Sequence, residues 1–335
     1  MRSIAPYINA ERCSVFFRRS GQDGPHQEGT HLVSEVTPLA PGRGPSFGIA
    51  TPPAQVAYGD LARVWREADA IPQIEHAWLY DHLMPIFGDP YGPAFEGWTL
   101  LAALAAQTGR LRLGLLVTSN RFRPPAMLAK IAAGVDVISG GRLEFGIGAG
   151  SNLTVPTARR EYEAYGLPFR DAAAAVGSLD EACAIIRRLW TESAPFDFDG
   201  SYHQLAGAFC SPKPVQRPRP PIMIGGRSTP TLRVVARYAD RWNMPGGSVG
   251  DAIARSAALD RLCAETGRDP AEITRSFILP ASYDRPGDTR AAIRAALDGG
   301  FGHIVLSLGA PYPAGAARWV ADTLIAPFTE HVSAG

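Results

Sequence analysis

Residues 111–150 read LRLGLLVTSNRFRPPAMLAKIAAGVDVISGGRLEFGIGAG and contain one complete strand–helix–strand unit. The apolar runs Leu111–Val117 and Leu143–Ile147 are short enough to be buried strands. Between them, apolar residues recur at helical spacing: Met127, Leu128, Ile131, Val135 and Ile138. Because a helix is the usual crossover between parallel strands, this unit predicts a parallel sheet.

The same alternation of strand and helix continues on both sides of this unit. Two further helices are indicated by Val176, Leu179, Cys183, Ile186 and Trp190, and by Val320, Leu324 and Phe328. Candidate strands lie at Ser46–Ala50, Ala77–Tyr80, Leu111–Val117, Leu143–Ile147, Pro221–Gly225, Arg241–Met244, Ile273–Pro280 and His303–Leu308. Eight such units match a closed (β/α)8 TIM-type barrel better than an open doubly wound sheet. We therefore predict one barrel domain over residues 46–331.

Two segments depart from the alternation. Residues 1–45 are rich in glycine and proline without sustained periodicity, so we expect a disordered N-terminal extension. Between Trp190 and Pro221, alternating residues around Asp199-Gly200 predict a β-hairpin, which a proline-rich extended segment follows. We interpret this segment as an insertion hairpin that covers part of the barrel mouth.

The composition narrows the class of partner. The chain has 335 residues, 46% hydrophobic and 19% charged, with a formal net charge of +1 and no long run of either sign. This balance argues against a nucleic-acid binder and favours a small-molecule substrate. The sequence contains no secretory signal and no apolar stretch long enough to cross a bilayer, so we expect a cytoplasmic protein. The four cysteines lie far apart, and no spacing suggests a metal site.

Polar residues at the ends of predicted strands are the candidates for catalysis, because barrel enzymes build their sites there. Asp81 and His82 end the second strand. A lone histidine is more often structural, but this one stands beside a carboxylate at a position that faces the site. Glu96 follows at the start of the next predicted helix, where it could also serve only to complement the helix dipole.

Two glycine-rich segments follow strands. Gly146–Gly150 fails the dinucleotide-binding fingerprint, because the third glycine would fall at Ser151. It is typical either of a closely packed strand end or of a backbone that a planar ligand approaches. Gly225-Gly226-Arg227-Ser228 precedes a helix and suits a phosphate, through the helix N-terminus and the arginine. The alternative is a loop in which Ser228 caps the helix.

One motif points to a different enzyme class. Gly246-Gly247-Ser248-Val249-Gly250 matches the nucleophile elbow of α/β-hydrolases. Pro245 separates it from the preceding strand, however, and Asp251 stands three residues after Ser248, as in a capping box. We therefore interpret Ser248 as a helix N-cap rather than a nucleophile.

Several ordered segments carry a family resemblance: Ala77–His82, Leu113–Pro125, Ser139–Gly150, Tyr165–Phe169, Pro212–Gln216, Pro221–Gly226 and Tyr238–Asn243. Together they resemble the luciferase-like monooxygenase superfamily, and within it the branch that uses the deazaflavin coenzyme F420. The resemblance runs from about Phe47 to about Ile325 and leaves the first 45 residues outside. Between the glycine loop and Tyr165 the stretch Ser151–Arg160 is longer than the family pattern, so Arg159, Arg160 and Glu161 receive no assignment.

The resemblance implies a TIM-type barrel with the cofactor ring over the strand ends. By position, Leu115–Leu116 resembles a bulge behind the ring that often contains a non-prolyl cis peptide. His82 matches a ring-adjacent histidine that donates a proton or polarises, with Asp81 setting its orientation. Glu96, Trp98 and Asn243 are then candidates for the substrate side. The implied cofactor contacts are Leu115, Leu116, Val117, Thr118, Gly148, Ala149, Gly150, Asn152, Gly225, Gly226, Arg227 and Ser228.

The resemblance also implies the reaction, which is hydride transfer between coenzyme F420 and a small organic substrate. Two alternatives remain open: an FMN-dependent monooxygenase of the same fold, and a cofactor-binding barrel without turnover. Homodimers are common in the family, so a homodimer is expected.

Overall fold

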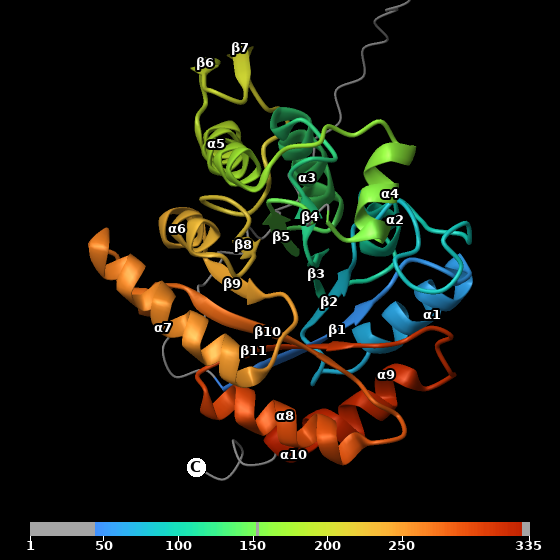
Figure 1. Cartoon of the computed structure of the whole chain (residues 1–335). Helices are drawn as coiled ribbons and strands as arrows, with labels where there is room; N and C mark the ends of the chain where they lie inside the picture. Colours follow the sequence, from blue (N-terminus) through green and yellow to red (C-terminus); the bar gives the residue numbers. More distant parts are fainter. Residues whose placement is uncertain (1–43, 152–153, 330–335) are drawn as a thin grey trace, which may run out of the picture. The chain divides into compact units, whose positions relative to one another are not determined.

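The computed structural model describes residues 44–151 and 154–329, and parallel strands form its centre (Figure 1). Eight of them make the barrel, and each is followed along the chain by at least one helix. They are β1 (Ser46–Thr51), β2 (His76–Leu79), β3 (Arg112–Leu115), β5 (Leu143–Gly148), β8 (Ile222–Gly225), β9 (Arg241–Met244), β10 (Thr274–Pro280) and β11 (His303–Ser307).

The sheet closes on itself. β1 pairs with both β2 and β11, and β3 pairs with β5, so the order around the barrel is β1-β2-β3-β5-β8-β9-β10-β11. The (β/α)8 prediction and all eight predicted strands are therefore confirmed. The predicted run Leu111–Val117 is interrupted: β3 ends at Leu115, and the short strand β4 (Thr118–Ser119) then pairs with β5.

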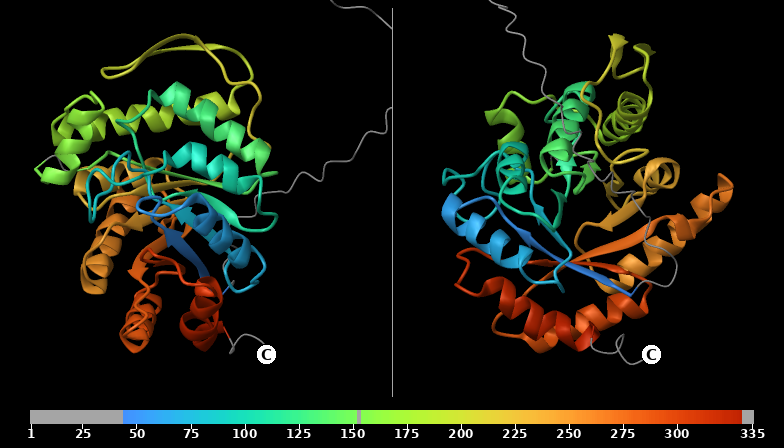
Figure 2. Two further views of the ribbon diagram at one scale, coloured as in Figure 1. Left: turned by 90° about the vertical axis from the view of Figure 1, so that its right-hand side faces the viewer. Right: turned by 180° about the vertical axis from the view of Figure 1, so that it is seen from behind.

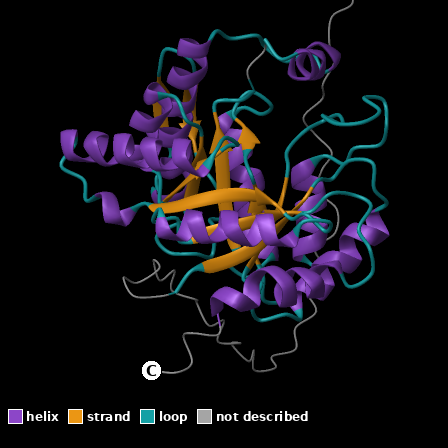
Figure 3. Ribbon diagram, turned by 60° about the horizontal axis from the view of Figure 1, so that its bottom comes forward, coloured by secondary structure: helices purple, strands orange, loops and turns teal. Residues whose placement is uncertain are grey.

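Helices surround the strands, as Figure 3 shows. The helices are α1 (Tyr58–Asp69), α2 (Gly97–Ala105), α3 (Pro125–Ile138), α4 (Pro156–Ala164), α5 (Ala172–Thr191), α6 (Thr229–Tyr238), α7 (Val249–Glu265), α8 (Pro286–Asp298), α9 (Ala316–Trp319) and α10 (Ala326–Thr329). A 3-10 turn, η1 (Pro270–Glu272), precedes β10, and a π-helical segment, η2 (Val320–Ile325), joins α9 to α10. In the described ranges, none of the helices is long and apolar enough to span a bilayer.

The helical periodicity correctly marked α5 and α3 but not every buried face. In α5 the predicted residues Leu179, Cys183, Ile186 and Trp190 are buried, whereas Val176, the first of the stripe, is only partly buried against the core. In α3 the two ends of the predicted stripe are wrong, because Met127 and Ile138 are 58% and 53% exposed. The buried face of α3 is instead built around small residues: Leu128, Ala129, Ala132, Ala133 and Val135.

The predicted hairpin is present as β6 (Phe196–Asp199) and β7 (Gln204–Ala208), and Figure 2 shows it extending beyond α5. Glu181 on α5 holds its turn by accepting hydrogen bonds from the backbone N–H groups of Ser201, Tyr202 and His203. The hairpin contributes no residue to the cavity at the barrel mouth. Its turn residue Tyr202 contacts Arg170, which does line the cavity, so the hairpin lies near the mouth, and that it covers part of the mouth stays a prediction.

A buried charge cluster fills the barrel near the starts of its strands; we define it as His76, Arg112, Glu144, Arg241 and His303. Glu144 forms ion pairs with both Arg112 and Arg241. Although burial raises the pKa of Glu144, the two arginines outweigh it and hold that pKa at about 2. The two imidazoles stack with centroids 3.9 Å apart, and burial lowers the pKa of His76 to about 3. Burial lowers the pKa of His303 as well, so both histidines are neutral near pH 7.

Candidate functional site

A cavity of about 1150 Å³ opens at the carboxyl ends of the barrel strands. Its walls come from the loops after β2, β4, β5, β8 and β9, together with α4 and the start of α5. Ligand pockets typically measure about 300–1,000 Å³, so this space suits a large cofactor with a substrate beside it. The position agrees with the rule that barrel sites form at this end of the strands.

The floor of the cavity is made by the bulge between β3 and β4. The peptide bond Leu116–Val117 is cis, one residue beyond the position that the resemblance implied. The Val117 side chain lies over glycines of two neighbouring strands, since a Cβ on Gly148 or Gly225 would stand 3.0 or 2.8 Å from its methyl groups. These glycines are therefore needed for Val117 to sit across the strand ends.

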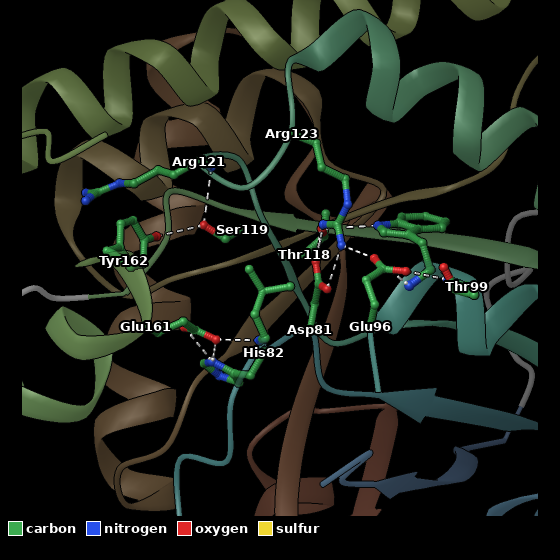
Figure 4. Close-up of polar contacts among 12 residues, drawn as sticks. Asp81, His82, Glu96, Thr99, Thr118, Ser119, Arg121, Arg123, Glu161 and Tyr162 are labelled. Atoms are coloured by element: carbon green, nitrogen blue, oxygen red, sulfur yellow. Dashed lines mark hydrogen bonds and ion pairs between the residues drawn. The ribbon is translucent and has the colours of Figure 1, made fainter. Parts of the chain in front are cut away.

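His82 lies at the end of β2 and lines the cavity, with its side chain 26% exposed. Its Nδ1 is 3.1 Å from a carboxylate oxygen of Glu161 on α4, which also accepts the N–H of Leu83 (Figure 4). Glu161 is buried. A carboxylate at this position accepts the Nδ1 hydrogen, so a neutral His82 carries its lone pair on Nε2.

Asp81 does not orient His82, contrary to the expectation. Its carboxylate instead accepts hydrogen bonds from Thr118 and from the guanidinium of Arg123, at 2.7 and 3.1 Å for the arginine (Figure 4). Glu96 pairs with the same arginine and caps α2 by accepting from Trp98 and Thr99. Burial opposes its ionisation, but hydrogen bonds from Thr99 and Arg123 hold the pKa of Glu96 below its usual value. Asp81, Arg123 and Glu96 therefore form a fixed ionic cluster, of which Asp81 lines the cavity.

The loop after β8 forms part of the cavity wall at the start of α6. The N–H of Gly226 already donates to the carbonyl of Asn243, and the Ser228 hydroxyl accepts from the Thr231 N–H as the N-cap of α6. Arg227 is exposed, lines the cavity and forms no ion pair within the described ranges. An anion at this helix N-terminus would therefore rely on Arg227 and the free backbone of the loop, rather than on a nest made by both glycines.

The structure brings most of the predicted site residues into one cavity. Leu115 does not line it, because its side chain packs in the core against α2. Glu96 does not line it either, because it pairs with Arg123 and caps α2. Asn152 lies outside the described residues. The predicted residues that line the cavity are Asp81, His82, Leu116, Val117, Thr118, Gly148, Ala149, Gly150, Gly225, Gly226, Arg227 and Ser228. Asn243, expected on the substrate side, also lines it.

Sequence reasoning missed the residues that hold this arrangement. Arg123 and Arg121 follow directly after a barrel strand, so the rule that places sites there was a usable signal. Glu161 follows a loop of unusual length, and no spacing in the sequence indicates that it pairs with His82. Ser248 is the N-cap of α7 with a complete capping box to Asp251, as interpreted from sequence. Across the described ranges, no cluster of His, Cys, Asp and Glu side chains is arranged to hold a metal ion.

Comparison with known proteins gives matches over most of the chain. Residues 45–327 match the family described as luciferase-like monooxygenase. The phthiodiolone/phenolphthiodiolone dimycocerosates ketoreductase of Mycobacterium sp. (strain JLS) is 29% identical over 272 residues, which cover 75% of this chain and 68% of that protein.

Two solved structures are similar in fold. An F420-dependent secondary alcohol dehydrogenase, in complex with an F420-acetone adduct, aligns with a TM-score of 0.72 at 16% identity, over 84% of this chain and 98% of that one. A riboflavin lyase with modified FMN and riboflavin aligns with a TM-score of 0.70 at 14% identity, over 88% and 93% of the two chains. At these identities the likeness concerns the fold.

Proposed function

The chain belongs to the luciferase-like monooxygenase family, and on that premise we propose that it is an oxidoreductase transferring a hydride between coenzyme F420 and a small organic substrate. Two neighbours support this choice of reaction. The relative named as a ketoreductase and the similar structure named as an F420-dependent secondary alcohol dehydrogenase both point to carbonyl–alcohol chemistry. When bound, coenzyme F420 supplies a two-electron hydride acceptor or donor.

The cavity fits such a cofactor. Gly148 and Gly225 make room for the Val117 side chain, and a planar ring would lie against the Leu116–Val117 segment that they support. Arg227 and the N-terminus of α6 would hold a phosphate. The ionic cluster of Asp81, Arg123 and Glu96 holds Asp81 in place at the side of the cavity, because each charge is already paired.

The observation that carries the proposal is the His82–Glu161 pair. Glu161 holds Nδ1 at 3.1 Å, and the described residues offer Nε2 no hydrogen-bond partner. Nε2 is therefore the atom that exchanges a proton with the substrate. As a secondary alcohol becomes a ketone, its hydride leaves from carbon and Nε2 takes the hydroxyl proton; in the reverse direction Nε2 returns it. Glu161 fixes the ring and stabilises the imidazolium that this transfer forms.

Turnover of F420 with a panel of ketones and secondary alcohols tests the reaction. We expect F420 absorbance to change only when a substrate is present, and without consumption of oxygen. An FMN-dependent monooxygenase is the second candidate, favoured by the family description and by the neighbour that holds modified FMN. Oxygen uptake with reduced FMN, together with no F420 turnover across the panel, would support that candidate instead. A barrel without turnover would bind cofactor and fail both assays.

A further inference from the structure

Three arginines line the cavity without a carboxylate partner. Arg121, Arg170 and Arg227 form no ion pair with any residue in 44–151 or 154–329. Arg159 also lines the cavity, but it pairs with Glu163 at 2.9 Å. Arg227 belongs to the β8–α6 loop already described. Arg121 and Arg170 stand elsewhere, on the loop after β4 and just before α5, and the proposed function does not use them.

Arg121 is held in place by contacts that leave part of its guanidinium free. Its Nε donates to the carbonyl of Ala149 at 2.9 Å. Its Cζ lies 5.6 Å from the centre of the Tyr162 ring, and Figure 4 shows the two side chains next to each other. Its Nη1 is buried and makes no hydrogen bond to any described residue. Gly150, at φ +92°, makes room for this arrangement, since a Cβ there would stand 2.6 Å from the Tyr162 hydroxyl and 3.1 Å from Arg121 Cδ.

Arg170 brings a second positive charge to the same wall. Its Cζ lies 5.6 Å from the centre of the Tyr202 ring, so an aromatic contact holds it as well. Burial and the neighbouring Arg170 lower the pKa of Arg121, against opposing effects of Tyr162 and of Asp171, a carboxylate that lines the same cavity. Asp171, the nearest carboxylate in sequence, caps α5 by accepting the Ala174 N–H at 2.8 Å. A buried guanidinium nitrogen beside a like charge is costly unless an anion offsets it.

We propose that Arg121 and Arg170 form an anion subsite for a carboxylate or phosphate group on the organic substrate, built on other segments of the cavity than the anion site at Arg227. A guanidinium binds such a group through two parallel hydrogen bonds, and in Arg121 the Nη1 donor is left without a partner among the described residues. The substrate of the proposed reaction is therefore an acid. That the anionic group belongs to the organic substrate rests on the proposed function. Anion binding itself does not depend on any redox step.

The test uses benzoate as the anionic probe and benzamide as its neutral isostere, measured by calorimetry on the full-length chain with and without F420. Arg121→Gln and Arg170→Gln are compared with Arg159→Gln, the matched control that lines the same cavity but is paired. We expect benzoate affinity to fall about tenfold or more in the first two variants and to stay within about twofold in the control. Benzamide affinity stays unchanged in all of them, and Arg121→Lys recovers part of the benzoate affinity.

Affinity for F420 and for its tail-less riboside separates the two sources of the anion. We expect both affinities to be unchanged in Arg121→Gln and Arg170→Gln. A loss confined to F420, with benzoate binding unaltered, would assign the arginines to the cofactor's own tail and overturn the substrate subsite. Equal benzoate affinity in the parent and both variants would overturn the anion site altogether. A parent protein that binds no F420 would contradict the proposed function. The benzoate affinities measured without F420 would then still test the anion site by themselves.

Discussion

Replacing His76 by glutamine should make the barrel less sensitive to acid. His76 is completely buried in the charge cluster, and its Nδ1 accepts the indole N–H of Trp78 at 2.7 Å. Tryptophan is only a donor, so the folded imidazole keeps Nδ1 unprotonated. A glutamine side-chain oxygen could accept the same hydrogen bond, but the amide does not titrate. The substitution therefore removes one titrating group while it retains a partner for Trp78.

The size of the effect follows from the pKa of His76, which burial lowers from 6.5 to about 3. In the unfolded chain the His76 imidazole binds a proton below pH 6.5, whereas in the folded chain it binds one only below about pH 3. Stability is therefore lost as pH falls below 6.5. At about pH 5, roughly 1.5 pH units below 6.5, the loss from this group is about 2 kcal/mol, at about 1.36 kcal/mol per pH unit. His303, whose pKa burial also lowers, adds a second loss that the variant retains.

Equilibrium urea unfolding of both proteins at about pH 7.5 and about pH 5 measures the effect, provided that unfolding is two-state. The parent should lose about 2 kcal/mol more than His76→Gln between the two conditions. Comparing each protein with itself at the higher pH cancels any packing cost of the substitution. Equal losses in the two proteins would refute the reasoning, because they would mean that His76 takes up a proton as readily in the fold as outside it.

Four further predictions concern the site. His82→Ala should keep F420 affinity within a few fold but slow hydride transfer on the order of a hundredfold, because Nε2 acts where charge develops; parental stopped-flow rates would leave His82 as packing. Glu161→Gln should also slow that step with little change in F420 affinity, since a neutral amide stabilises the imidazolium less; an unchanged single-turnover rate would count against the pair. Arg227→Ala should weaken F420 binding about tenfold without changing the melting temperature, because Arg227 is exposed and unpaired among the described residues; unchanged fluorescence titration would remove the phosphate from this loop. Gly150→Ala should lose about 1–3 kcal/mol in chemical denaturation, because φ is +92° and Tyr162 occupies the space of a Cβ; parental stability would show that the loop relaxes freely.

The fold could be predicted from sequence because its strands are short apolar runs separated by helical periodicity. Arg241–Met244 was placed with its observed bounds. The interior of the barrel could not be read in the same way. Glu144 and His76 look like surface positions in their strands, and only closure of the sheet shows that they face one another inside it. Likewise, apolar periodicity alone could not show that Met127 and Ile138 lie on the exposed side of α3.

The site could be predicted as far as it follows the strand ends. Asp81, His82, Val117, Gly148 and Gly225 occupy such positions and line one cavity. The partners of these residues could not be predicted, because they depend on three-dimensional packing. His82 reaches across to Glu161 on α4, 79 residues away, rather than to its neighbour Asp81. Asp81 instead accepts hydrogen bonds from Arg123, which lies on the loop before α3.

The central claim is that the barrel mouth is built for coenzyme F420. Parallel titration of the full-length protein with F420 and with FMN, followed by cofactor fluorescence, tests it without knowledge of the substrate. We predict that F420 binds at micromolar or better affinity and that FMN binds more weakly. Tight FMN binding with no detectable F420 binding would contradict the claim and make the flavin monooxygenase the better account of this cavity.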